Sequence, residues 1–344
     1  MRKKIPEWLE FDQIILPEPV SIEQASSRIT ATYKSELLKG GTMLDLTGGL
    51  GVDTYYFAKR VDKVIYVERD PEIATIASYN FSLMGLNNIE VKCQPAEKFL
   101  LEWGTSVDYI FLDPSRRNVS GKVFKLEDSD PNLLEIQDDL LRKSKVVMTK
   151  ASPYIDLQYA IQQVRGINEI HVLAVNNECK EILLILDQSF KKDDIIINTI
   201  NYTGKSFQKY ISSVVTEHNS GCDIAISGPF VYDPNAAIRK AGLFRSICKD
   251  FGIKKPANNS HIYFGDTLVS NFPGRTFELI EIISYHKFMK HRLFKKANIA
   301  IRNFPLSVAD IKKKTGIKDG GDIFIFGTTD HSKNIFFIIC RKAI

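Results

Sequence analysis

Short apolar runs alternate with amphipathic segments over the first half of the chain. Seven runs are predicted to be strands by their length and their buried character: Met43–Leu46, Lys63–Val67, Ile89–Cys93, Val107–Leu112, Lys145–Thr149, Glu169–Val175 and Glu181–Leu186. Helical segments separate most of them. Alternating strands and helices predict an α/β fold with a mostly parallel sheet.

Two local signals sharpen this prediction. One helix is well delimited, because Asp70 is a good N-cap, Pro71 suits the first helical position and Gly85 ends the pattern. The last two strands are joined only by Asn176–Lys180. So short a connection predicts an antiparallel hairpin that closes the sheet.

The flanking parts have a different character. Residues 1–40 are predicted to be largely helical, with Ser21 capping a helix that carries Ile22, Ala25, Ile29 and Ala31. Past residue 190, strands at Phe230–Tyr232, His261–Phe264 and Thr276–Ile283 accompany one helix from Asn235 to about Phe251, and the order after Tyr285 is helix, strand, helix, strand, strand. The predicted division is therefore 1–40, 41–205, 206–284 and 285–344.

Composition places the chain among globular proteins. Of its 344 residues 44% are hydrophobic and 25% charged, and no apolar run approaches the ~18–20 residues of a membrane span. Acidic residues close to the N-terminus argue against a signal peptide. Five scattered cysteines without a CxxC pair predict neither a disulfide framework nor a metal site, and they fit a cytoplasmic protein.

The net charge of +5 conceals a strong asymmetry. Residues 285–344 hold thirteen Lys and Arg against four acidic residues, so this segment carries +9 and the remainder −4. Lys312, Lys313 and Lys314 form the densest basic run. Clustered basic residues are typical of proteins that bind a phosphate backbone, although a merely solvated basic surface is the alternative.

A glycine-rich segment follows the first predicted strand. It reads Asp45-Leu-Thr47-Gly48-Gly49-Leu-Gly51-Val-Asp53, and its glycines permit a sharp turn and close approach to a ligand. A carboxylate at Asp45 can hold an ammonium group. Glu68, at the end of the second strand, can accept both hydroxyls of a ribose. The GGxG spacing and the acid before it disfavour the alternative, a dinucleotide site with its GxGxxG loop.

These residues resemble the S-adenosylmethionine site of class I methyltransferases, whose fold is a Rossmann-like seven-stranded sheet. The resemblance covers residues 41–187 and implies that Asp45, Gly48, Gly49 and Gly51 line the methionine half of the cofactor, that Glu68 holds the ribose, and that Gln94–Glu97, including Ala96, flank the adenine. We assign the neighbouring Thr47, Asp53, Arg69 and Asp113 to the same cofactor site.

The fourth strand ends in Asp113-Pro114-Ser115-Arg116-Arg117, where this fold faces the reactive methyl group. Amino-directed nucleic acid methyltransferases carry Asp or Asn, then Pro-Pro and an aromatic residue. Only Asp113 and Pro114 match that pattern, and we predict them as the catalytic pair, with Asp113 orienting the substrate or accepting its proton. Arg116, Arg117 and Lys150 are predicted to bind substrate phosphate. Cys179 is either a nucleophile or a small buried apolar residue.

The C-terminal part resembles the THUMP-like domain of a bacterial methyltransferase family. The segments that carry the resemblance are Ala297–Val308, Lys318–Phe326, Ala237–Phe244 and Asn271–Arg275, the last two in a ferredoxin-like middle domain. THUMP domains accompany tRNA-modifying enzymes, so the resemblance implies an RNA partner, tRNA or rRNA. The alternatives are a small-molecule or protein substrate, and a non-catalytic RNA-binding protein. The oligomeric state stays open.

Overall fold

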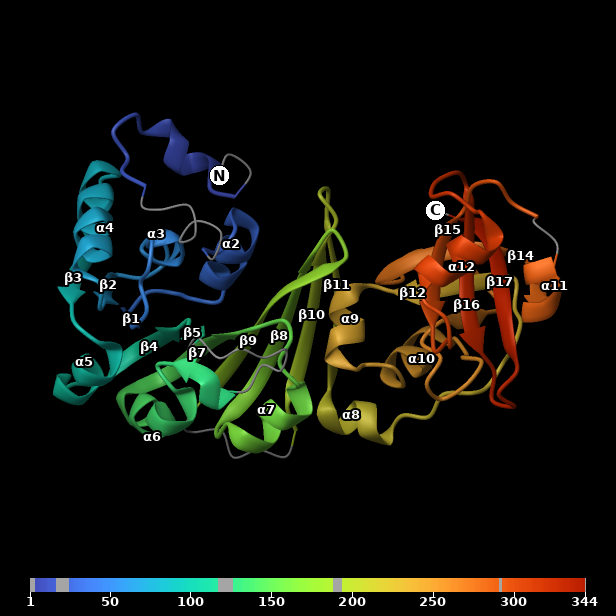
Figure 1. The fold of residues 1–344 in the computed structure, drawn as a ribbon. Helices are drawn as coiled ribbons and strands as arrows, with labels where there is room; N and C mark the ends of the chain where they lie inside the picture. Colours follow the sequence, from blue (N-terminus) through green and yellow to red (C-terminus); the bar gives the residue numbers. More distant parts are fainter. Residues whose placement is uncertain (1–3, 17–24, 117–125, 188–193, 291–292, 344) are drawn as a thin grey trace. The chain divides into compact units, whose positions relative to one another are not determined.

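A computed structural model describes residues 4–16, 25–116, 126–187, 194–290 and 293–343 (Figure 1). The chain forms two compact units. The first comprises Met1–Leu173 and Lys180–Ile196, and the second comprises Ala174–Cys179 and Ile197–Ile344.

Seven strands between residues 42 and 187 follow each other across one sheet in the order β8-β9-β7-β4-β1-β2-β3. Their bounds are Thr42–Asp45 (β1), Lys63–Glu68 (β2), Ile89–Cys93 (β3), Val107–Leu112 (β4), Ser144–Ala151 (β7), Ile167–Val175 (β8) and Glu178–Asp187 (β9). Strand β1 is parallel to β2 and β4, β2 to β3, and β4 to β7, whereas β9 is antiparallel to β7. The parallel sheet and the antiparallel strand β9 are thus confirmed. The hairpin does not end the sheet, however, because the strand order continues past β8 with β10 (Ile196–Tyr202) and β11 (Phe207–Ser213), which the sequence analysis missed.

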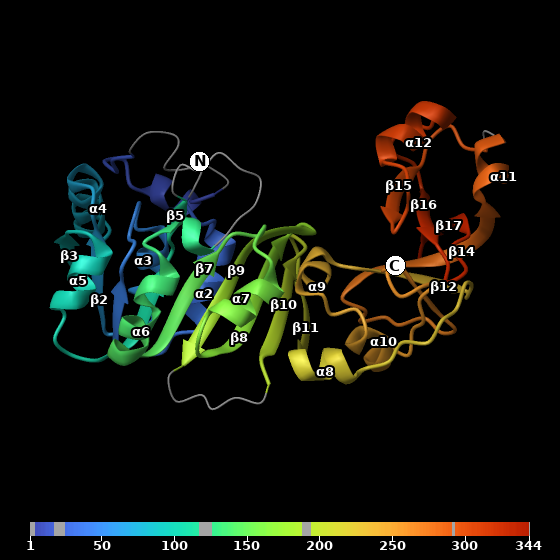
Figure 2. The ribbon, with the colours of Figure 1, turned by 60° about the horizontal axis from the view of Figure 1, so that its bottom comes forward.

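Helices cover both faces of this sheet. Their bounds are Arg28–Glu36 (α2), Val52–Phe57 (α3), Pro71–Leu83 (α4), Ala96–Glu102 (α5), Leu133–Lys143 (α6) and Leu157–Gln163 (α7). Helices α2 to α4 lie on one face and α5 to α7 on the other (Figures 1 and 2). Helix α4 begins as predicted, because the Asp70 carboxylate accepts hydrogen bonds from the backbone N–H groups of Glu72 and Ile73.

The β8–β9 hairpin turns on Asn176 and Asn177, which have φ angles of 50° and 63°. Two consecutive residues with positive φ define a type I′ turn, whose twist matches that of the paired strands. Asparagine tolerates this conformation better than most residues, which explains the tight connection.

The N-terminal part is less helical than predicted. It contains a short 3₁₀ helix, η1 (Pro6–Glu10), and then α2. The predicted cap Ser21 lies outside the described residues, and α2 begins after Ser27, whose hydroxyl accepts a hydrogen bond from the Thr30 N–H. Ala25 precedes the helix rather than belonging to it.

The second unit is built on a six-stranded sheet with the order β13-β12-β14-β17-β16-β15. The bounds are Phe230–Pro234 (β12), Tyr263–Gly265 (β13), Gly274–Ser284 (β14), Asn298–Arg302 (β15), Ile323–Thr329 (β16) and Ile335–Lys342 (β17). The helices are α8 (Val214–Asn219), α9 (Ala236–Ala241), α10 (Ser246–Phe251), α11 (Tyr285–Lys290) and α12 (Val308–Thr315). The order of elements predicted after Tyr285 is confirmed.

Alternating side chains of this sheet supply two separate cores. Phe336 and Ile338 pack in one cluster with Phe277, whereas Phe337 and Ile339 pack in the other with residues of α11 and α12. This two-residue period is the signature of a sheet buried on both faces.

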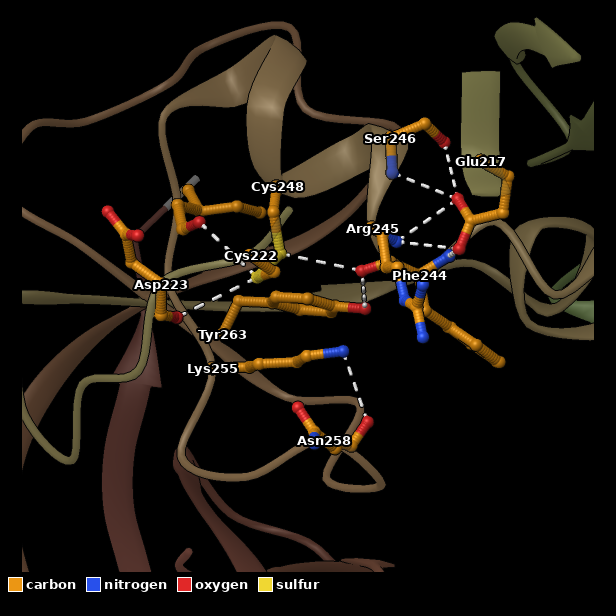
Figure 3. The surroundings of a disulfide bond; sticks show 11 residues. Glu217, Cys222, Asp223, Phe244, Arg245, Ser246, Cys248, Lys255, Asn258 and Tyr263 are labelled. Atoms are coloured by element: carbon orange, nitrogen blue, oxygen red, sulfur yellow. Dashed lines mark hydrogen bonds between the residues drawn. A yellow bond between two sulfur atoms is a disulfide. The ribbon is translucent and has the colours of Figure 1, made fainter. Parts of the chain in front are cut away.

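The helix predicted from Asn235 to Phe251 is in fact two helices. Gly242 adopts a left-handed conformation with φ of 75° and ends α9. Helix α10 then starts afresh, because the Glu217 carboxylate accepts hydrogen bonds from the N–H groups of Phe244, Arg245 and Ser246 (Figure 3). A cap supplied by a residue so far away in the sequence leaves no local signal.

The expectation about the cysteines is also corrected. Cys222 and Cys248 form a disulfide (Figure 3), while Cys93, Cys179 and Cys340 keep their thiol groups. The fold brings the two Cα atoms to 5.4 Å across 26 residues of sequence, a separation that suits a disulfide. Neither cysteine lies in a recognisable spacing motif, so the sequence could not indicate the pair.

Within the described residues, no helix is both long and apolar enough to cross a bilayer.

Candidate functional site

A cavity of about 780 Å³ opens in the first unit, beside the carboxyl ends of β1, β2, β4 and β7. Strand β1 pairs with β2 on one side and β4 on the other, so the sheet order reverses here, and this is where parallel sheets commonly bind ligands. The volume is that of a small-molecule site. The predicted residues on its wall are Asp45, Thr47, Gly48, Gly49, Asp53, Glu68, Arg69, Ala96, Asp113, Pro114 and Lys150.

The glycine-rich loop after β1 is shaped by two close approaches. A Cβ at Gly48 would lie 2.0 Å from the ring of Tyr66, and one at Gly51 would lie 2.3 Å from the ring of Phe81. Gly51 also has φ of 77° at the start of α3. Gly51 therefore packs against Phe81 and does not line the cavity. Packing alone therefore requires a residue without a side chain at both positions.

Asp45 is the most strongly perturbed acid of the site. It is 1% exposed, its carboxylate accepts hydrogen bonds from the Thr54 hydroxyl at 2.5 Å and the Thr47 N–H at 3.3 Å, and it borders the cavity. Burial raises its pKa to about 7, against the lowering effect of the Thr54 hydrogen bond. A cationic group in the cavity would stabilise the ionised form of this buried carboxylate.

Glu68 connects the loop after β1 to the loop after β2 through hydrogen bonds. One carboxylate oxygen accepts a hydrogen bond from the Gly49 N–H at 2.9 Å, and the other accepts one from the Asp70 N–H at 2.9 Å. Each oxygen keeps a further lone pair for a ligand hydroxyl. Its neighbour Arg69, 59% exposed, pairs with Asp130 at 2.5 Å across the rim.

Sequence reasoning missed a buried charge cluster behind the loop. Lys34 on α2 is fully buried, and its ammonium group lies 2.9 Å from Asp53, 3.2 Å from Glu181 and 2.7 Å from the Ser26 hydroxyl. Asp53 therefore binds Lys34 and lines the cavity at once. A lysine in an amphipathic helix gives no indication that it will be buried, so only the fold could have revealed this cluster.

Asp113 and Lys150 form an ion pair at the cavity wall. The Lys150 ammonium donates to the Asp113 carboxylate at 2.5 Å, and the Asp113 N–H donates to the Thr47 hydroxyl at 2.6 Å. Burial alone would lower the pKa of Lys150, but the charges of Asp113, Glu181 and Asp53 outweigh it and leave that pKa raised. Lys150 is thus a fixed cation that orients Asp113 toward the cavity.

The other predicted substrate residues are placed differently. The backbone of Arg116 belongs to the short strand β5 (Ser115–Arg116), which pairs with β6 (Ser129–Asp130). Arg117 and the side chain of Arg116 lie outside the described residues. Lys312, Lys313 and Lys314 lie in α12 of the second unit, apart from the cavity wall.

The wall residues fit S-adenosylmethionine. The buried Asp45 carboxylate complements an ammonium group, and the free lone pairs of Glu68 complement ribose hydroxyls. Ala96 at the start of α5 also lines the cavity, and its small side chain leaves room there for the adenine. In the part of the chain that the structure describes, no group of three or more His, Cys, Asp or Glu residues could hold a metal ion.

Comparisons with known proteins identify the family. A ferredoxin-like domain model matches residues 230–273, and a THUMP domain-like model matches residues 274–342. A Porphyromonas gingivalis W83 protein, solved as a candidate methyltransferase, superposes with a TM-score of 0.91 at 31% identity, covering 100% of this chain and 87% of that one.

Curated relatives are more distant. An uncharacterized S-adenosylmethionine-dependent methyltransferase of Mycobacterium tuberculosis is 20% identical over 82% of this chain and 72% of its own length. An uncharacterized RNA methyltransferase of Nostoc is 34% identical over 76 residues, which are 22% of this chain and 16% of that protein. The relatives support a methyltransferase that uses S-adenosylmethionine.

Proposed function

Because the chain belongs to the S-adenosylmethionine-dependent methyltransferases that carry a ferredoxin-like and a THUMP-like domain, we propose that it methylates a structured RNA, a tRNA or an rRNA. The single observation that carries this substrate is the exposed basic face of α12 in the THUMP-like region. Short local matches to two RNA methyltransferases, from Nostoc and Oceanobacillus iheyensis, also support it. The proposal includes the cytoplasm as the place of action.

Helix α12 is built to present positive charge to a partner. It starts with a capping box between Ser307 and Asp310 and buries Ile311 on its inner side. Lys313 and Lys314 are exposed, whereas Lys312 pairs with Asp319 at 2.7 Å. Lysines on a rigid helix can neutralise successive phosphates of an RNA backbone.

In this proposal the cavity of the first unit binds the cofactor, whose sulfonium supplies an activated methyl group. The Asp45 carboxylate accepts a hydrogen bond from the ammonium group of the cofactor, and the Glu68 carboxylate accepts hydrogen bonds from its ribose hydroxyls. The loop of Gly48 and Gly49 lies along the methionine half of the cofactor. The ion pair with Lys150 holds the Asp113 carboxylate at the cavity wall. Asp113 then orients the target atom and accepts its proton, while Pro114 fixes the backbone beside it. Methyl transfer is a displacement that needs positioning more than covalent help.

Transfer of labelled methyl groups from S-adenosylmethionine tests this function. The acceptors are total RNA, protein and small-molecule fractions from cells that lack the gene. We expect label in RNA, and none with Asp113→Asn. Label only in protein or in small molecules would overturn the RNA substrate while leaving the methyltransferase.

The basic helix is tested by changing Lys312, Lys313 and Lys314 together to Gln. RNA affinity should fall, and the dependence of log affinity on log salt should flatten by about 1 to 2, given roughly 0.7 per phosphate contact on single strands. A matched control changes the exposed Lys63, Lys98 and Lys145 of the first unit. Equal effects of both triple variants would contradict a role specific to α12.

A further inference from the structure

Three arginines of the second unit converge on one buried carboxylate. Asp233 in β12 is 1% exposed. Arg275 binds its Oδ2 through Nη2 at 2.7 Å and Nε at 3.2 Å, and Arg302 binds Oδ1 with the same two distances. Arg239 lies 3.6 Å from Oδ1.

The fold assembles this cluster from four elements. Asp233 and Arg275 are register partners in β12 and β14. Arg302 comes from the end of β15, and Arg239 comes from α9, which Asn235 caps directly after β12. The three arginines lie in separate segments that carry the family resemblance, but no spacing motif connects them over the 69 residues from Asp233 to Arg302.

The cluster carries more positive charge than its own acid can balance. Among the ion pairs of the described residues, all three arginines share Asp233, and none of the three pairs with another acid. The site therefore holds a net charge of about +2. Burial and the charges of Arg302 and Arg275 lower the pKa of Arg239 despite the attraction of Asp233. The same surroundings, through burial and then through Lys255 and Arg302, hold the pKa of His261 at about 4.

The arginine side chains are partly exposed although the carboxylate is not. The side chain of Asp233 is fully buried, whereas Arg239, Arg275 and Arg302 are 26%, 38% and 18% exposed. Arg275 spends Nε and Nη2 on Asp233, which leaves Nη1 for a ligand. Its guanidinium also lies over the rings of Phe277 and Phe324, at 5.6 and 5.9 Å, and these contacts fix its plane.

We propose that Arg239, Arg275 and Arg302, set in place by Asp233, form a binding site for a phosphate group of the RNA backbone. One arginine would suffice to neutralise the charge of Asp233. Arg275 and Arg302 together already donate four hydrogen bonds to its two oxygens. The third arginine, Arg239, adds repulsion between the three positive charges, and binding of an external anion relieves that repulsion. Planar guanidinium forks match phosphate oxygens, and a preset geometry lowers the cost of binding. The inference rests on the proposed function, since it takes the phosphate from RNA.

The test uses full-length protein with Arg239→Gln. This change keeps the four hydrogen bonds from Arg275 and Arg302 to Asp233 and removes only the contacts of Arg239 with Asp233 and with the Pro234 carbonyl, so the thermal midpoint should fall little. RNA affinity should fall by about threefold to tenfold, and the salt dependence of log affinity should flatten by about 1. The control is Arg165→Gln in the first unit, where the arginine is 71% exposed and pairs with Asp138. The control should change affinity less than twofold.

A second variant separates charge from geometry. Arg275→Lys keeps the charge and the pairing with Asp233 but loses the planar fork, so RNA affinity should fall while the salt dependence stays close to that of the unmodified protein. Unchanged RNA affinity in both variants would overturn the inference.

Two further measurements identify the source of the phosphate and separate a failure of this site from a failure of the proposed function. Inorganic phosphate at constant ionic strength should compete with RNA only weakly. If it binds tightly to the unmodified protein and not to Arg239→Gln, while both bind RNA equally, the site takes a small phosphate and the RNA assignment is wrong. Methyl transfer into RNA by the unmodified protein is measured in the same preparation. Its absence there refutes the proposed function, whereas its presence together with unaffected variants refutes only this site.

Discussion

Replacing Asp45 by asparagine should stabilise the first unit at alkaline pH while weakening cofactor binding. The pKa of this buried acid is raised from the ordinary 3.8 to about 7, mainly by desolvation. At about 1.4 kcal/mol per pH unit, keeping it ionised at pH 8 costs the folded state about 4 kcal/mol. Asparagine removes that cost but loses about 1 kcal/mol, because its amide cannot accept both hydrogen bonds that Asp45 accepts. The net gain is about 2–3 kcal/mol.

The stability cost of ionising Asp45 increases with pH. Because the folded state holds a proton that the unfolded chain releases, the penalty is absent below about pH 4, grows between pH 4 and pH 7, and is constant above pH 7. Asp45→Asn should therefore match the unmodified protein near pH 4.5 and exceed it at pH 8. Its affinity for S-adenosylmethionine at pH 8 should fall by about 10- to 100-fold, since a charge-assisted hydrogen bond is lost.

The assay is denaturant unfolding followed by tryptophan fluorescence. The chain has two tryptophans, Trp8 and Trp103, and both lie in the first unit, so the signal reports on the unit that holds Asp45. Asp138→Asn, at a site 65% exposed, is the control and should change stability by less than about 0.5 kcal/mol. A variant less stable than the unmodified protein at pH 8, or a gain independent of pH, would refute the reasoning.

Three further predictions concern other parts of the molecule. Asp113→Ala should keep S-adenosylmethionine affinity within about tenfold by calorimetry while abolishing turnover, because Asp113 acts on the acceptor; full activity would contradict its role. Gly51→Ala should destabilise the first unit by about 2–4 kcal/mol in the fluorescence assay, since its φ of 77° and the ring 2.3 Å from its Cβ both oppose a methyl group; an unchanged unfolding midpoint would show that the loop adapts. Thiol titration in denaturant should find three thiols rather than five, and reduction should cost about 3 kcal/mol for a loop of this length, because Cys222 and Cys248 are bonded; five thiols before reduction would exclude the bond.

The sequence predicted what local pattern determines. The bounds of the seven strands predicted before residue 187 were correct to within a few residues, because most of them are short apolar runs. The helix after Asp70 was correct because its cap, its proline and the glycine that follows it are all local signals at its own two ends. Asp45, Gly48 and Glu68 could be assigned to one site because adjacent parallel strands deliver their loops to the same edge.

What the sequence missed depends on contacts between distant residues. Lys34 becomes part of the site only through Asp53 and Glu181, and the break before α10 requires a cap from Glu217. The Arg302 contact with Asp233 joins residues 69 positions apart. None of these pairs has a characteristic spacing, so no periodicity or motif could indicate them.

Whether this methyltransferase modifies RNA can be decided by nucleoside mass spectrometry of tRNA and rRNA from cells with and without the gene. We expect one methylated nucleoside that is lost from the deletion strain and restored when its RNA is incubated with the purified enzyme and S-adenosylmethionine. Identical nucleoside profiles in the two strains, with no methyl group added by the purified enzyme, would contradict it.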